Sequence, residues 1–224
     1  MTRKSALEKQ CELISWPFSS VTAVYSESGS WSFNGSYGLH PEEVVAQTMS
    51  NHDCICSWCE GGSINLMLKA ASLSVLIRRN TFQDRSDAIR RYLEAQLTIL
   101  SQYSGEIVEC ARSITHADLI RNIKEICADD FLRDAYSRVR EEFLFKLADK
   151  ISVDLRIQLL EKYMLKPYEY RAGWPDLTVI SNKGISFVEV KTTDRLHDSQ
   201  MRFANEIAAP LQLRCEIVRV IPAK

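Results

Sequence analysis

The sequence predicts an α/β protein in which a mostly helical region precedes a small mixed sheet. Apolar residues recur at helical spacing through the middle of the chain. Near Leu177 this pattern changes to the alternation that is typical of strands. The chain has 224 residues, of which 46% are hydrophobic, so it is long enough for one domain or two small ones.

The composition excludes several classes of protein. The charged fraction of 25% is ordinary for a globular protein and argues against disorder. The net charge of −1 argues against a protein that coats nucleic acid by bulk charge, although a local basic patch suffices for an enzyme. No apolar run approaches the ~18 residues of a membrane span, and no signal peptide follows the basic start. We expect an intracellular protein, cytoplasmic if of bacterial or phage type and nuclear if eukaryotic.

Residues 1–40 form a distinct N-terminal segment that is rich in Ser, Gly and aromatic residues. We expect short strands and loops here, with two strands on either side of a turn at residues 26–29. The rings of Trp31, Phe33 and Tyr37 can stack on bases or pack a small sheet, and packing is the more common role.

Residues 41–165 are expected to form a helical region. Pro41 suits the first turn of a helix that ends near Ser50, and Glu42 and Glu43 suit the positive end of its dipole. A short strand follows at residues 54–58. Apolar spacing and Ser or Thr caps predict the later helices at residues 63–79, 86–100, 115–127, 130–149 and 153–163.

Three of the seven cysteines lie close together, at Cys54, Cys56 and Cys59. The spacing Cys56-x-x-Cys59 occurs in zinc sites, but the other cysteines are scattered and offer no second pair of ligands. Buried free thiols are therefore the favoured interpretation.

The C-terminal region has the pattern of a hairpin, with strands at residues 177–180 and 185–191 around a turn at residues 182–184. A helix at residues 199–209 and a third strand at residues 213–221 follow.

Pairing of Ser181 with Gly184 in this hairpin places Asp176 opposite Glu189, so two carboxylates converge. Because side chains alternate along a strand, Lys191 shares the face of Glu189. Two carboxylates and a backbone carbonyl suit a hard cation such as Mg²⁺ or Mn²⁺. The alternative is a surface hairpin in which Lys191 forms a salt bridge with one carboxylate.

Three segments of this region resemble the VRR-NUC branch of the PD-(D/E)xK nucleases, the branch that contains the nuclease domain of Fanconi-associated nuclease. They are GWPDL at residues 173–177, FVEVK at residues 187–191 and DRLHDSQ at residues 194–200. The resemblance implies a restriction-endonuclease-like core at residues 166–224. A weaker likeness includes CEGG at residues 59–62.

The resemblance also implies the roles of individual residues. It implies that the metal ligands are Glu60, Asp176, Glu189 and the carbonyl of Val190. Lys191 would be the catalytic lysine, and Gln200 would support the catalytic site.

The implied function is metal-dependent hydrolysis of phosphodiester bonds in DNA, selective for flapped or branched structures or for single-stranded ends, with a link to DNA repair. Small members of the family often act as homodimers. One alternative is a Holliday-junction resolvase or a defence-type endonuclease with the same site. Another is an inert DNA-binding or scaffold protein, against which the intact Asp176, Glu189 and Lys191 argue.

DNA binding requires positive charge, and residues 69–91 contain six basic residues against two acids. An ordinary solvated helix face explains this stretch almost as well. Two further arginines flank the nuclease motifs. The candidate DNA-binding residues are Arg78, Arg79, Arg85, Arg171 and Arg195.

Overall fold

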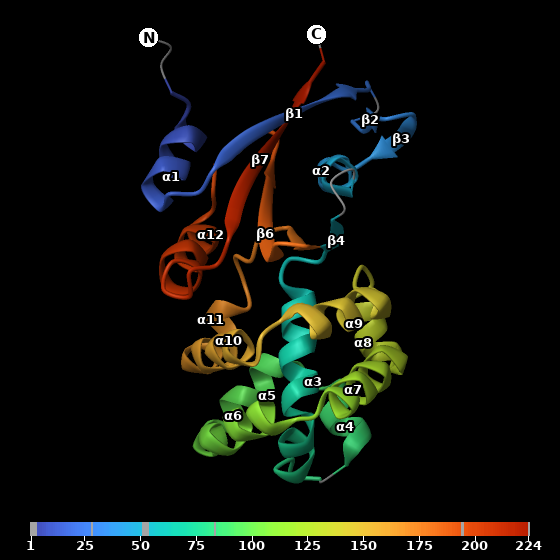
Figure 1. The fold of residues 1–224 in the computed structure, drawn as a ribbon, viewed down its shortest axis with the longest axis vertical. Helices are drawn as coiled ribbons and strands as arrows, with labels where there is room; N and C mark the ends of the chain where they lie inside the picture. Colours follow the sequence, from blue (N-terminus) through green and yellow to red (C-terminus); the bar gives the residue numbers. More distant parts are fainter. Residues whose placement is uncertain (1–3, 28, 51–53, 83, 194, 224) are drawn as a thin grey trace. The chain divides into compact units, whose positions relative to one another are not determined.

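The computed structural model describes residues 4–27, 29–50, 54–82, 84–193 and 195–223. The chain forms two compact units (Figure 1). One unit consists of residues 1–60 together with 173–224, and the other of residues 61–172. These bounds differ from the predicted division at residues 40 and 165, because the N-terminal strands belong to the same sheet as the C-terminal ones.

The first unit contains a mixed sheet of seven strands in the order β3-β2-β1-β7-β6-β5-β4 (Figure 1). β7 runs parallel to both β1 and β6, and the other neighbouring strands are antiparallel. The predicted α/β class with a mixed sheet is confirmed. The strands are β1 (Phe18–Tyr25), β2 (Trp31–Phe33), β3 (Ser36–Leu39), β4 (Ile55–Trp58), β5 (Leu177–Ser181), β6 (Gly184–Lys191) and β7 (Cys215–Pro222).

The hairpin of β5 and β6 has the register that the sequence predicts. Leu177 pairs with Val188, and Ser181 pairs with Gly184. Gly184 has φ +102°, a left-handed conformation that side-chain-bearing residues rarely adopt, so a glycine closes this turn. The pairing brings the start of β5 beside the end of β6.

Helices cover both faces of the sheet (Figure 1). On one face, Val44 and Val45 of α2 (Pro41–Ser50) pack with Val188 and Val190 in an apolar core. On the other face, Phe203 of α12 (Asp198–Phe203) meets Phe187, with ring centroids 6.4 Å apart. The predicted helix at residues 199–209 is thus α12 followed by a π-helical turn, η2 (Ala204–Ala208).

The first helix, α1 (Ala6–Ile14), lies in the segment for which only strands and loops were expected. Its signal is a capping box: Ser5 accepts a hydrogen bond from the backbone of Glu8, and the Glu8 side chain accepts one from the Ser5 backbone. The signal is local, because Ser5 and Glu8 stand three positions apart in the sequence. The predicted turn at residues 26–29 includes Ser28, which lies outside the described residues.

The second unit is helical, as expected, and is built around α3, whose side chains are nearly all buried. No helix in the described part of the chain is both long enough and apolar enough to cross a membrane. The helices are α3 (Gly62–Arg78), α4 (Arg85–Arg90), α5 (Leu93–Ile99), α6 (Ser104–Ser113), α7 (His116–Ala128), α8 (Asp130–Ala135), α9 (Glu141–Lys150), α10 (Val153–Leu165) and α11 (Pro167–Tyr170).

Two predicted helices, at residues 86–100 and 130–149, are each divided into two. In the first, the side chain of the buried Lys69 donates a hydrogen bond to the backbone carbonyl of Arg91. This carbonyl therefore has a side-chain partner in place of a helical N–H. In the second, the ring of Tyr136 packs against Gly62, where a Cβ would lie 2.9 Å from it. Neither break contains a Gly or Pro, and each lies beside a tertiary contact.

Candidate active site

Asp176, Glu189 and Lys191 converge at the open end of the β5–β6 hairpin. Asp176 Oδ2 accepts a hydrogen bond of 2.8 Å from the backbone N–H of Val190. Lys191 Nζ lies 2.8 Å from Glu189 Oε1. The expected pairing of Lys191 with one carboxylate is thus present, but its expected surface position is wrong, because Glu189 is 1% exposed and Lys191 is 8% exposed.

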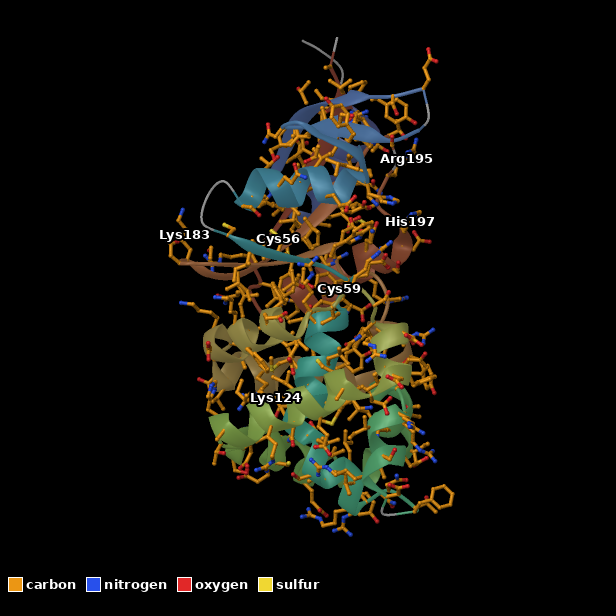
Figure 2. All side chains as sticks on the ribbon, turned by 90° about the vertical axis from the view of Figure 1, so that its right-hand side faces the viewer. Cys56, Cys59, Lys124, Lys183, Arg195 and His197 are labelled. Carbon is orange, nitrogen blue, oxygen red and sulfur yellow. The ribbon has the colours of Figure 1, made fainter. Side chains whose placement is uncertain are left out.

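Gln200 joins this group from the first turn of α12. Its Nε2 donates to Glu189 Oε1 at 2.5 Å, and its Oε1 accepts from the backbone N–H of His197 at 2.9 Å. The amide is therefore held at both ends, and it fixes the orientation of the Glu189 carboxylate. Figure 2 shows His197 and Arg195 at one end of the sheet and Lys183, in the hairpin turn, at the other.

Gly173, the first residue of the GWPDL motif, explains how the loop and α12 approach each other. A Cβ at Gly173 would lie 2.1 Å from the carbonyl oxygen of Ser199, and its φ is +87°. Only glycine fits such an approach of two backbones. The loop that carries Asp176 is thereby packed on the helix turn that carries Gln200. Asp194, in the third motif, lies outside the described residues.

The two carboxyl groups are strongly perturbed. The pKa of Glu189 is raised to about 8, chiefly by burial and also by the neighbouring charge of Asp176, while Lys191 opposes the shift. Burial also raises the pKa of Asp176 to about 6, against the hydrogen bond from Val190. Burial together with mutual repulsion is typical of carboxylates that share a functional site.

This donor set fits a hard divalent cation. Glu189 Oε2 is buried and has no hydrogen-bond partner among the described residues. A buried carboxylate oxygen without a donor is costly unless a cation satisfies it. Asp176, Glu189 and the Val190 carbonyl are oxygen ligands of the type that Mg²⁺ and Mn²⁺ prefer.

Glu60 contacts this group through its backbone. Its N–H donates to the carbonyl of Asp176 at 3.3 Å, but its side chain is exposed. Its charge is the weakest of the named influences on the pKa of Asp176. No three His, Cys, Asp or Glu side chains in the described ranges converge enough to hold a metal ion. The role of Glu60 as a third ligand therefore stays a prediction.

Glu42 is a further acidic neighbour, which the sequence did not single out. It lies in the first turn of α2, and its charge raises the pKa of Asp176 more than that of Glu60 does. Its Oε2 is buried without a hydrogen-bond partner among the described residues. From its position after Pro41, Glu42 was expected only to stabilise the helix dipole. Its neighbours in the sequence do not show that the start of this helix lies near Asp176.

Four of the five candidate DNA-binding arginines have acidic partners within the helical unit. Arg78 and Arg79 both bind Glu106, at 2.8 and 2.7 Å. These acids come from other helices, so counting charge along residues 69–91 overstated the positive charge of the surface. Arg195 is exposed beside His197 (Figure 2). The other ion pairs are Arg85 with Glu125 and Arg171 with Glu94.

The three clustered cysteines form no disulfide among the described residues, and Cys56 lies in the edge strand β4 (Figure 2). They are not part of any metal-binding group among the described residues. Burial raises the pKa of the Cys56 thiol to about 12, so this thiol is protonated at neutral pH. The three side chains are only partly buried, so the expectation of buried thiols is wrong for them.

Two of the solved structures that resemble this protein are similar to it over the whole chain. Both are crystal structures of paFAN1 bound to 5′-flap DNA with a gap, one with a 2-nt flap and one with a 1-nt flap. Each has a TM-score of 0.59, and the sequence identities are 15% and 17%. The fold is similar to that of paFAN1. The chain spans about two fifths of the paFAN1 chains, 39% and 40% of their length.

No protein-family model and no curated protein sequence matches this chain. The resemblance to the VRR-NUC branch therefore continues to depend on the three motifs, whereas the likeness to paFAN1 shows the fold.

Proposed function

We propose that the protein is a Mg²⁺- or Mn²⁺-dependent nuclease that hydrolyses phosphodiester bonds in DNA and selects flapped or branched structures. The buried group of Asp176, Glu189 and Lys191 carries this proposal. Two carboxylates that burial and repulsion destabilise, beside a lysine at 2.8 Å, need a cation for their charge to be stable. The fold likeness to paFAN1, which was crystallised with flap DNA, supports the substrate class.

Each residue of the group has a definite task in this proposal. Asp176, Glu189 and the Val190 carbonyl hold the divalent cation, and Glu42 or Glu60 adds a further acidic group. When bound, the cation polarises a phosphoryl oxygen and lowers the pKa of water. Lys191 is held by Glu189, so its ammonium group can orient the attacking water or stabilise the charge that develops on the phosphate. Gln200 positions the Glu189 carboxylate.

The same site serves a Holliday-junction resolvase or a defence-type endonuclease equally well, and these two enzymes remain the alternative functions. A role in DNA repair and action as a homodimer are parts of the proposal that follow from the VRR-NUC resemblance. An inert DNA-binding protein is disfavoured. Such a protein has no need of a buried Glu189 that lacks a donor for one oxygen.

We favour Arg195 over the four arginines with acidic partners as a residue of the DNA-contacting surface. Glu106, which pairs with both Arg78 and Arg79, already offsets one of their two charges. Release of counterions by these two residues is therefore smaller than the sequence suggested. Substitution of both by glutamine should flatten the salt dependence of binding only slightly.

Cleavage of a panel of labelled DNA structures tests the proposal. The panel contains 5′ flaps, Holliday junctions, single strands and plain duplexes, each with Mg²⁺, Mn²⁺ or a chelator. We expect cation-dependent cleavage that Asp176→Asn abolishes, with the exposed Asp198→Asn on α12 as a matched control. An Asp176→Asn protein that cuts at the parental rate would sink the site assignment.

A further inference from the structure

The helical unit contains a small pocket at the C-terminal end of α3, where this helix lies beside α4 and α6 (Figure 1). Residues of α3, of α5 and of the 3₁₀ turn η1 (Ser101–Tyr103) line it. Its volume is about 210 Å³, which is below the ~300–1,000 Å³ of a pocket for a drug-sized ligand. The pocket therefore suits a ligand with one small ring system.

A buried amide with an unsatisfied oxygen lines this pocket. Gln96 of α5 is 3% exposed, and its Nε2 donates to the backbone carbonyl of Ala88 at 2.9 Å. Its Oε1 is buried and accepts no hydrogen bond from any residue in the described part of the chain. The bond to Ala88 fixes which end of the amide is the acceptor. A buried acceptor without a donor is costly, so a ligand that donates an N–H to Oε1 gains this free energy on binding.

Two arginines in the lining can donate to the same ligand. Arg79 uses Nε and Nη2 to bind Glu106, and Arg91 uses Nε and Nη2 to bind Asp87. These bonds hold both guanidinium groups in place. The remaining nitrogen, Nη1, of each arginine has no partner among the described residues, so its N–H groups can donate to acceptors on a ligand.

An aromatic ring supports one of these arginines. The guanidinium carbon of Arg79 lies 4.4 Å from the centroid of the Tyr103 ring, a stacking distance for a cation and an aromatic face. Tyr103 lines the pocket as well, together with the buried side chains of Leu76 and Leu100. Polar donors, one acceptor and apolar contacts are thus gathered in one small space. A planar heterocycle with donors and acceptors at its edge matches this lining.

The acids beside the arginines limit the charge that a ligand can carry. Glu106 contacts both Arg78 and Arg79, and Asp87 contacts Arg91. Three positive charges are thus opposed by two negative ones, so this group has a small surplus of positive charge. A DNA strand brings a phosphate with every nucleotide and gains little here from release of counterions. A free nucleoside or mononucleotide is therefore favoured over a strand.

We propose that this pocket binds the base of a free nucleoside or nucleotide, and that it prefers guanine. An N–H of guanine donates to Gln96 Oε1, and the adjacent acceptors O6 and N7 receive hydrogen bonds from Arg79 or Arg91. Guanine is the base that arginine recognises most often, because it alone has two neighbouring acceptors on this edge. The proposal goes beyond the nuclease function, since it assigns the helical unit a ligand of its own.

Calorimetric titration of the full chain with guanosine, without DNA or divalent cations, tests this proposal. Guanosine has no phosphate, so a surface charge alone cannot attract it. We expect saturable binding of guanosine that is tighter by about tenfold or more than that of adenosine, cytidine or uridine. The parental protein should bind 7-deazaguanosine, which lacks the N7 acceptor, about tenfold more weakly, as expected for one lost hydrogen bond to a charged group.

Variants of the lining check which residues bind the base. Arg79→Gln and Gln96→Leu should each weaken guanosine binding about tenfold, and the comparison with 7-deazaguanosine holds even if a variant fails to fold. Arg78→Gln is the matched control and should bind as the parental protein does, because Arg78 contacts the same Glu106 from outside the lining. No saturable guanosine binding, equal affinities for the four nucleosides or an equal loss in Arg78→Gln would overturn the proposal. Displacement of guanosine by flap DNA with an unpaired guanine would overturn it as well, because the ligand would then be a strand.

Discussion

Replacement of Glu189 by glutamine should make the metal-free protein more stable at pH 8 while it abolishes cleavage. Glu189 is 1% exposed, and one of its carboxylate oxygens has no donor among the described residues. Glutamine keeps the shape and an acceptor oxygen for Lys191 and Gln200 but carries no charge. The buried charge, which only a bound cation would offset, is thereby removed.

The magnitude follows from proton linkage. The pKa of Glu189 rises from 4.5 to about 8 on folding, so between these values the folded protein holds a proton that the unfolded chain has released. The free energy of unfolding then falls as pH rises, by about 1 kcal/mol per pH unit. Between pH 6 and pH 8 the parental protein should lose on the order of 2 kcal/mol more than Glu189→Gln does.

Urea denaturation in the presence of a chelator at pH 6, 7 and 8 measures this difference. Glu161→Gln, at an exposed acid of α10, is the control and should show the parental pH dependence. Added Mn²⁺ should stabilise the parental protein at pH 8 and release protons, which calorimetry in two buffers detects. Equal slopes for the parental protein and Glu189→Gln would show that Glu189 is ionised in the folded state, and the electrostatic argument would fail.

Three further substitutions test other parts of the site. Lys191→Ala should lower the single-turnover rate far more than DNA affinity, because its proposed interaction strengthens in the transition state; lost binding with retained chemistry would make it a phosphate clamp instead. Glu42→Gln should weaken Mn²⁺ binding and slow cleavage, whereas the adjacent Glu43→Gln should do neither; equal effects would remove Glu42 from the site. Gly173→Ala should lower the melting temperature and cleavage together, since its Cβ would lie 2.1 Å from the Ser199 carbonyl; a variant of parental stability would show that this approach is not tight.

The sequence alone predicted the parts of the protein that depend on local patterns. Alternation of side chains and a short turn determined the β5–β6 register, and with it the meeting of Asp176 and Glu189. Helices whose caps are local, such as α7 behind Thr115, were also predicted close to their observed bounds. These features depend on residues a few positions apart, so they can be predicted without knowledge of the tertiary structure.

The tertiary structure decided whatever depends on residues far apart in the chain. Parallel pairing of β1 with β7 joins residues about 200 positions apart and makes the N-terminal strands part of the sheet. The same folding brings Glu42 toward Asp176 and places Glu106 beside Arg79. Charge in a sequence is counted along the chain, whereas electrostatic energy depends on distance in space. For that reason the burial of Glu189, the influence of Glu42 on Asp176 and the pairing of the arginines became visible only in the folded protein.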